Sequence, residues 1–211
     1  MKIKSLLITL IFLSLSFQTE AQETEQKIYR YYDKSQVLLS WDITTPLSNN
    51  YISSTGFAGA RLEYRYFTSR TFSFGGSIGW NTLEKYQSPD TYQQSQTSTV
   101  YTDMVRQIQL LPILATVHYY LSDSADRKPY VSLGAGANYA KVASYYNIFV
   151  SDEKTWGFAV RPEIGFQFFN SSGFGFNVHV AYSYASNKTE ELANLDGLQG
   201  LNYGIGIIWT Y

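Results

Sequence analysis

Residues 174–184 read FGFNVHVAYSY. Every even-numbered position holds a large apolar or aromatic side chain, and every odd-numbered position holds a smaller or polar one. Successive side chains of a β-strand point to opposite faces, so this period of two predicts a strand with one apolar face and one small, polar face. Helical periodicity is scarce along the chain.

The same alternation recurs along most of the remaining sequence. It predicts eight strands, at 37–44, 58–66, 71–82, 105–121, 131–139, 157–168, 173–185 and 201–211. The alternation in 105–121 changes phase between its two halves, and one extra residue near Leu111-Pro112 would reconcile them. We therefore expect a β-bulge there, because a bulge is where a sheet tolerates proline.

The connections between these strands are alternately short and long. The short ones lie at about 68–70, 122–128 and 170–172, and the long ones at about 45–55, 83–103, 143–154 and 186–199. An up-and-down meander would collect the short turns at one end and the long loops at the other. Outer-membrane barrels have this pattern, with short periplasmic turns and long extracellular loops.

The polar face of the predicted strands carries charge. Its charged members and one histidine are Asp42, Arg61, Glu63, Arg65, Arg161, Glu163 and His179. In a soluble lipocalin-like barrel, the aromatic side chains of the other face would have to fill an interior barely wide enough for ordinary side chains. A flat β-sandwich meets a related objection, because Gly, Ser and Ala make the polar face a poor solvent-exposed surface. We therefore predict an all-β fold: an eight-stranded antiparallel up-and-down transmembrane β-barrel with a polar lumen.

Aromatic residues gather near both ends of the predicted strands. The expected girdle residues are Tyr64, Tyr66, Phe72, Trp80, Trp156, Phe168, Tyr184, Trp209 and Tyr211. Amphipathic rings favour the two membrane–water interfaces, so this placement predicts two aromatic girdles. The alternative, that aromatic residues simply favour strands, explains their number but not their position.

The N-terminal segment has the three regions of a secretory signal peptide. Lys2 and Lys4 precede the apolar run 6–17, and cleavage is expected between Ala21 and Gln22. A membrane anchor is the weaker interpretation, because the run is shorter than the roughly 20 residues that cross a bilayer. We expect residues 1–21 to be the signal peptide, 22–36 a periplasmic lead-in and 37–211 the barrel domain.

Composition excludes several classes of chemistry. The chain has no Cys, so disulfides and thiolate sites are absent, and its two His are too few for a His-rich metal site. We expect no metal and no cofactor. With 16 basic and 17 acidic residues, the near-neutral balance predicts no nucleic-acid partner.

Several short motifs resemble one known family. They are Glu63-Tyr64-Arg65-Tyr66-Phe67, the run 74–80, Arg161-Pro162-Glu163-Ile164-Gly165 and the Ala21-Gln22 context. They are similar to the outer-membrane β-barrel proteins of Bacteroidota, often called PorT-like, which share the eight-stranded architecture of OmpA and OmpX. The resemblance covers residues from about 36 onward. It implies a location in the outer membrane of a Gram-negative bacterium, with lipid and lipopolysaccharide as neighbours, and supplies no catalytic residues.

The C-terminal residues carry a second resemblance. Tyr211 is an aromatic last residue, and Trp209, Ile207 and Ile205 precede it at alternate positions. This resembles the signal by which the outer-membrane assembly machinery recognises barrels. It implies that this machinery is a partner of the last strand.

The charged lumen leaves two interpretations open. A salt-bridged polar core that plugs the barrel is favoured, because eight-stranded barrels are filled and buried charges must be paired. The alternative is a gated path for small solutes or a buried acid–base site.

An enzyme that acts on lipid A is the other class to consider. Acyl-ester hydrolysis needs a His beside a Ser. On a strand, a His and a Ser on the same face would stand two residues apart. Ala181 follows His179 at that spacing, and Tyr120 follows His118, so neither His has a Ser partner. Asp123-Ser124 resembles an acyltransferase pair but falls in a predicted periplasmic turn. We therefore expect no enzymatic activity.

The expected loop 83–103 is the most distinctive candidate for an interaction. It contains Tyr86, Tyr92, Tyr101 and a Gln/Ser/Thr run at 93–99, a composition that could bind glycans or a surface partner. A solvated loop without a ligand is the simpler interpretation. The sequence thus predicts a structural or surface-interaction scaffold, and a soluble periplasmic binding barrel is the least favoured alternative.

Overall fold

The computed structural model describes residues 35–47, 51–95, 98–122, 124, 126–146, 149–170, 173–189 and 197–211. The expected signal peptide, the Ala21–Gln22 bond and most of the expected lead-in lie outside these residues. The described residues include no helix that is long and apolar enough to cross a membrane.

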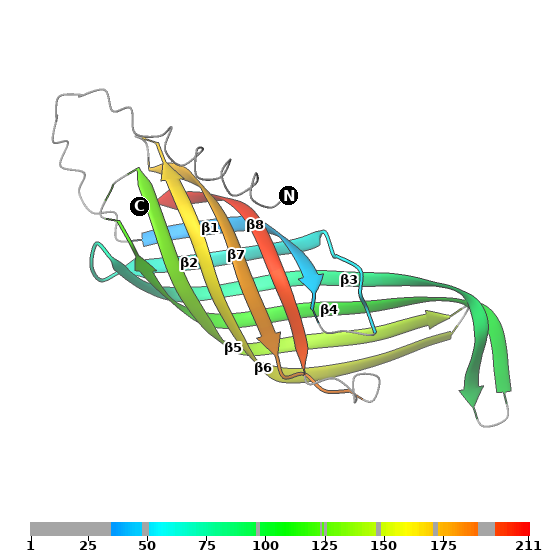
Figure 1. The fold of residues 1–211 in the computed structure, drawn as a ribbon. Coiled ribbons are helices and arrows are strands. Elements are labelled where there is room, and N and C mark those ends of the chain that lie inside the picture. Colours follow the sequence, from blue (N-terminus) through cyan, green and yellow to red (C-terminus); the bar gives the residue numbers. More distant parts are fainter. Residues whose placement is uncertain are drawn as a thin grey trace, which may run out of the picture. The chain divides into compact units, whose positions relative to one another are not determined.

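The described residues form eight antiparallel strands in one closed barrel (Figure 1). The strands are β1 (Ser35–Pro46), β2 (Ala58–Phe67), β3 (Phe72–Ser95), β4 (Ser98–Tyr120), β5 (Arg127–Tyr146), β6 (Phe149–Phe169), β7 (Phe174–Ala185) and β8 (Leu198–Thr210). Each strand pairs with its neighbours in sequence, and β1 pairs with β8 from Gln36↔Thr210 to Pro46↔Gly200. The predicted fold class is confirmed, with β1 beginning two residues before the expected boundary.

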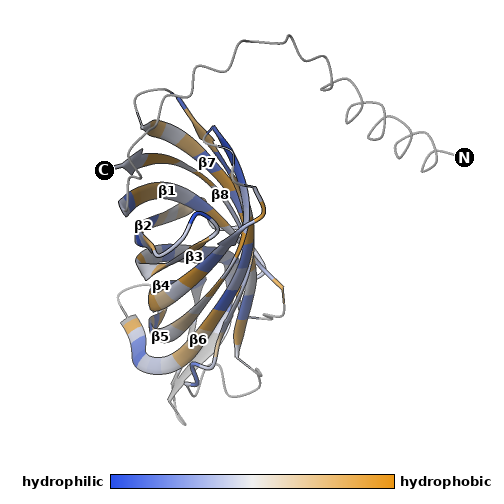
Figure 2. Cartoon of the chain, turned by 90° about the vertical axis from the view of Figure 1, so that its left-hand side faces the viewer, coloured by the Kyte–Doolittle hydropathy of each residue, from blue (hydrophilic) through white to orange (hydrophobic). Residues whose placement is uncertain are grey.

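Side chains alternate between the lumen and the outer surface, as the period of two predicts. Apolar and polar residues follow one another along most strands (Figure 2). Ile164 and Phe176 on the outer face are 62% and 59% exposed, whereas Leu38 and Glu63 on the inner face are fully buried. The outer surface of the barrel wall is therefore apolar, as a lipid-facing surface requires.

Two of the four segments expected to be long loops are strands instead. Strands β3 to β6 have 20–24 residues, and the other four have 10–13. Residues 84–87, 104–107, 141–146 and 149–155 continue beyond the barrel wall as a four-stranded sheet, and β3 and β4 extend farther as a two-stranded hairpin (88–95 with 98–103). Together these segments are here called the β3–β6 arm (Figure 1). The expectation of loops at 83–103 and 143–154 was wrong because their Thr, Tyr and Val residues fit strands, and each segment finds a pairing partner in the adjacent strand.

The expected bulge at Leu111-Pro112 is also wrong. The register of β4 with β5 is continuous from Val105 to Tyr120, and the register shifts of the β3–β4 pair lie between Gln87 and Asp90 and beyond Gln93. Odd-numbered side chains of β4 therefore stay on the outer face throughout. Their chemistry changes from apolar to polar because the strand leaves the apolar part of the barrel wall.

The inner face changes from polar to apolar toward the arm. An apolar cluster fills this end of the lumen; its members are Tyr51, Ile52, Leu83, Ile108, Leu114, Ala140, Val142, Ala159, Ala185 and Leu198. Tyr51 and Ile52 come from the β1–β2 connection, which folds inward and is held by two backbone hydrogen bonds between Thr44 and Gly56. The Tyr51 hydroxyl lies 2.7 Å from Ser144 Oγ. The lumen is therefore polar in one part and apolar in another.

Ile52 should be one of the main supports of this apolar cluster. Because Ile52 is fully buried, Ile52→Ala is expected to lower the free energy of unfolding by about 2–5 kcal/mol. Leu47→Ala, in the same connection but 50% exposed, is the matched control. Urea unfolding of the refolded barrel, followed by electrophoresis without boiling, measures both. Equal losses for the two variants would contradict the inward-folded connection.

Candidate functional site

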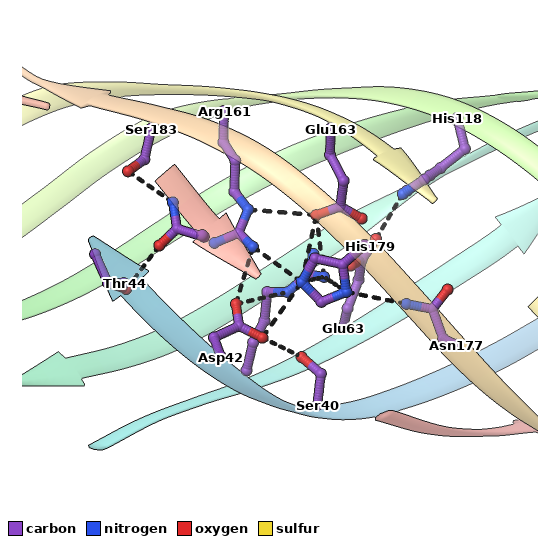
Figure 3. A network of polar contacts seen from close by, with 12 residues as sticks. Ser40, Asp42, Thr44, Glu63, His118, Arg161, Glu163, Asn177, His179 and Ser183 are labelled. Carbon is purple, nitrogen blue, oxygen red and sulfur yellow. Dashed lines mark hydrogen bonds and ion pairs between the residues drawn. The ribbon is translucent and has the colours of Figure 1, made fainter. Parts of the chain in front are cut away.

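Charged side chains from five strands meet in the lumen (Figure 3). This ion cluster consists of Asp42 (β1), Arg61, Glu63 and Arg65 (β2), His118 (β4), Arg161 and Glu163 (β6) and His179 (β7). Their side chains are between 0% and 6% exposed. The structure thus brings together all seven lumen residues expected from the sequence, because each occupies an inward position of its strand.

Glu63 forms one half of the cluster. Its Oε2 lies 2.6 Å from Arg61 Nη1, and its Oε1 accepts a hydrogen bond of 2.9 Å from Arg65 Nε. His118 Nε2 lies 2.6 Å from the same Oε1. One carboxylate is thus held by two guanidinium groups of its own strand and an imidazole from β4, two strands away.

Glu163 bridges two strands in the same way. Its Oε2 lies 3.1 Å from Arg61 Nη2 and 3.3 Å from Arg161 Nε. Its Oε1 accepts a 2.7 Å hydrogen bond from the Tyr130 hydroxyl. Arg61 therefore lies between two glutamates, which balances charge across the lumen.

Asp42 completes the set. Arg161 Nη2 donates to Asp42 Oδ2 at 2.9 Å, and Ser40 Oγ donates to Oδ1 at 2.7 Å. His179 Nε2 lies 3.4 Å from the same Oδ1. Three carboxylates thus face three guanidinium groups, a pairing that offsets the cost of removing six charges from water.

Two glycines make room for the rings of this network. A Cβ on Gly204 would overlap the imidazole of His179, and a Cβ on Gly165 would overlap the Tyr130 ring. Only a residue without a side chain lets each ring come this close to the neighbouring strand. These glycines thereby position His179 and Tyr130 for their contacts with the carboxylates.

Sequence reasoning missed Tyr130 and Asn177 as members of the network. The Tyr130 hydroxyl lies 3.0 Å from Asn177 Oδ1, and Asn177 Nδ2 lies 3.1 Å from His179 Nδ1. Tyr130 stands one residue before the predicted strand 131–139, so extending that strand would have placed the side chain inward. Asn177 was on the polar face already, but nothing local singled it out.

The ion cluster is covered on both sides. Toward the short turns lie the buried rings of Phe67, Tyr120 and Tyr130, with Lys128 Nζ 5.2 Å from the Phe67 ring centre. Toward the arm, a cavity of about 50 Å³ separates the cluster from the apolar core. Such a space holds a few water molecules at most. The arrangement can therefore act as a rigid plug.

The nine expected girdle residues all lie on the outer face. Their exposures range from half-buried Tyr66 and Tyr184 to 63% for Trp156 and 65% for Tyr211. Neighbouring rings pack across strands, with centroids 5.6 Å apart for Phe174 and Trp209.

Within the described residues, no group of three or more His, Cys, Asp and Glu side chains could hold a metal ion.

A family model for the outer membrane protein beta-barrel domain matches residues 7–209. The chain belongs to the outer membrane protein beta-barrel domain family. A search of curated proteins finds no match. Outer-membrane barrels in general have short periplasmic turns and longer extracellular loops.

Solved structures that are similar in fold to this outer membrane barrel include the following two. One is Ail, the attachment invasion locus protein of Yersinia pestis, in complex with the heparin analogue sucrose octasulfate (TM-score 0.51, 15% identity, 84% of this chain and 97% of Ail covered). The other is Neisserial surface protein A (TM-score 0.53, 14% identity, 84% and 97% covered). At these identities the likeness shows the fold alone.

The ion cluster makes a graded prediction about stability. Arg61→Ala is expected to cost about 3–5 kcal/mol, because it leaves Glu63 and Glu163 buried with fewer partners. Glu63→Gln should cost less, because the amide keeps hydrogen bonds to the remaining donors. Urea unfolding measures both, with Arg127→Ala, at an exposed position of the barrel, as control. If Arg61→Ala matched the control, the cluster would not support the fold.

Gly204 offers a second test. Gly204→Ala should destabilise the barrel by about 1–3 kcal/mol, because the new methyl group displaces the His179 ring. Gly76→Ala is the matched control, since a Cβ there meets only Leu114 O at 3.6 Å. Thermal unfolding in detergent compares the two variants. A destabilisation by Gly76→Ala as large as that by Gly204→Ala would show that strand glycine, and not the ring contact, is responsible.

Proposed function

We propose that this outer membrane barrel is a non-enzymatic structural or surface-interaction scaffold with a plugged lumen. The observation that carries the proposal is that the described interior is filled, while the β3–β6 arm projects from the end of the barrel opposite the short turns (Figure 1). Outer-membrane barrels turn that end to the cell exterior. Any contact with a molecule outside the barrel must therefore be made by the outer face or by the arm.

The arm favours a role in contact over a role as a flexible cover. Tyr86 and Tyr101 are 61% and 74% exposed, and their backbones are paired with Val105 and Thr91. Side chains held on a sheet lose less conformational freedom on binding than those of a mobile loop. The side chain of Tyr92 lies outside the described set. A glycan or protein on the cell surface is the class of partner that exposed tyrosines on paired strands would suit.

A lipid A-modifying enzyme is the second candidate, and the histidines argue against it. The chain has two His, and both side chains are buried in the lumen at 0% exposure. Acyl-ester hydrolysis needs the imidazole beside the lipid ester. A small-solute channel is disfavoured by the ion cluster and by the apolar core above it.

The finer assignments belong to the same proposal. The motif at residues 63–67 and the segment 161–165 support membership of the Bacteroidota, PorT-like branch. The apolar run 6–17 and Ala21-Gln22 support secretion through a cleaved signal peptide. The alternating apolar residues at the end of β8, with Trp209 in the strand and Tyr211 just after it, support insertion by the outer-membrane assembly machinery.

Location and function can be tested together in a deletion strain. Because the natural chain lacks Cys, Tyr101→Cys provides a single thiol on the arm, and Arg127→Cys provides one at the periplasmic end. We expect a membrane-impermeant maleimide to label the first in intact cells and the second only after the outer membrane is opened. Mass spectrometry of lipid A should show no difference between the deletion strain and the complemented strain. A lipid A change restored by the wild-type chain would overturn the proposal in favour of an enzyme.

A further inference from the structure

The outer face of β3 to β6 carries ordered rows of side chains above the apolar wall. Strand register places Tyr139 beside Trp156, and two residues farther out it places Lys141 beside Lys154. Two residues are about 7 Å along a strand, or about 5 Å along the membrane normal at the usual tilt. The lysines therefore lie just outside the aromatic girdle, at the depth of lipid head groups.

Lys141 and Lys154 are direct cross-strand neighbours. Like charges in this position destabilise an antiparallel pair unless an anion lies between them. Lys141 Nζ lies 3.7 Å from Asp152 Oδ2, and these side chains are 31% and 40% exposed, so the contact is weak. Among the described residues, exposed Lys154 forms no ion pair with a carboxylate. The pair thus has unsatisfied positive charge.

Two aromatic rings lie on the membrane side of the lysines. The Tyr139 and Trp156 rings pack with centroids 5.3 Å apart, and Trp156 is 63% exposed. Such rings lie at the boundary between acyl chains and polar head groups. A ligand of the lysines would therefore have its acyl chains against the wall and its anionic group at the row of cations.

Along the membrane normal, the cationic groups form one row and the acidic groups form the next row outward. Gln109 pairs with Lys141 and extends the cationic row with an amide. Acidic Glu84 and Asp152 stand one row farther out, and Gln107 Nε2 donates to Glu84 Oε1 at 2.5 Å. The positive charge therefore lies nearest the membrane, where a lipid phosphate would meet it first.

A third row lies beyond the acids. Its members are Tyr86, Val105, Tyr145 and Val150, and each pairs with the next one across strands β3 to β6. Tyr86, Tyr145 and Val150 are 61%, 37% and 56% exposed. This row is about 20 Å along the strands from the girdle pair at Tyr139 and Trp156, outside the depth of phospholipid head groups. Tyrosine rings offer flat apolar faces to sugars.

We propose that Lys141 and Lys154, above Tyr139 and Trp156, bind a phosphate group of lipopolysaccharide, whose sugars pack on the Tyr86–Val150 row. The inference rests on the proposed outer-membrane location. Lipopolysaccharide is the one occupant that combines acyl chains at the wall, phosphate at the lysine row and sugars at the third row. The site is continuous with the lipid-facing surface of the barrel.

Binding of purified lipopolysaccharide to the full refolded barrel in detergent tests the site, with tryptophan fluorescence as readout. Lys141→Gln/Lys154→Gln should weaken binding about tenfold or more, because two cations near a phosphate are lost. Arg70→Gln/Arg127→Gln removes the same net charge at exposed positions of the opposite end and should leave affinity unchanged. Chemically dephosphorylated lipopolysaccharide should bind wild type as weakly as the intact form binds the lysine variant.

Three outcomes would overturn the inference. The lysine variant would bind as tightly as wild type, the arginine control would lose as much affinity, or phosphatidylglycerol micelles would compete as well as lipopolysaccharide. The electrophoretic shift on heating and the outer-membrane fraction are measured on every variant. A barrel that is absent from the outer membrane contradicts the proposed function, whereas a correctly located barrel with unchanged binding contradicts only the phosphate site.

Discussion

Closure of the sheet by the β1–β8 pair is the constraint on which the rest of the molecule depends. A bilayer offers no water to satisfy backbone N–H and C=O groups, so a spanning sheet cannot keep a free edge. The pairing of β1 and β8 over eleven consecutive positions, from Gln36 to Pro46, removes that edge. Closing eight strands also sets a narrow interior, and every inward side chain must then fit a shared space.

The narrow interior explains why charge and glycine occur together. Six charged groups can occupy it only as a mutually paired set, because each removed from water alone would cost several kcal/mol. Arg61 reaches both Glu63 and Glu163, and Asp42 reaches Arg161 on the far side of the lumen. The absent side chain of Gly204 gives the imidazole of His179 its space. The polar network and the small residues around it are one packing solution.

The surroundings of the barrel change along its axis, and the side chains follow. Beside lipid, the outer face is apolar and the lumen holds the ions. Beyond the girdle, the outer face carries Lys141, Lys154 and Asp152, while the inner face is filled by Leu83, Ile108 and Val142. The same strands thus have membrane-protein polarity in one part and soluble-protein polarity in another. This inversion lets β3 to β6 continue into water as an ordered arm.

The sequence by itself determined the eight strands, their two faces and the inward position of the seven polar lumen residues. Alternation is a local property of an extended chain, so parity alone assigns Glu63 or Arg161 to the lumen. Only the tertiary structure decided which groups meet, because Asp42 and Arg161 are 119 residues apart in sequence and their contact depends on register around the whole barrel. It also decided that 83–103 and 143–154 are strands, and that the phase change in β4 needs no bulge. Whether a polar segment becomes a loop or a strand depends on the pairing partner that the closed sheet places beside it.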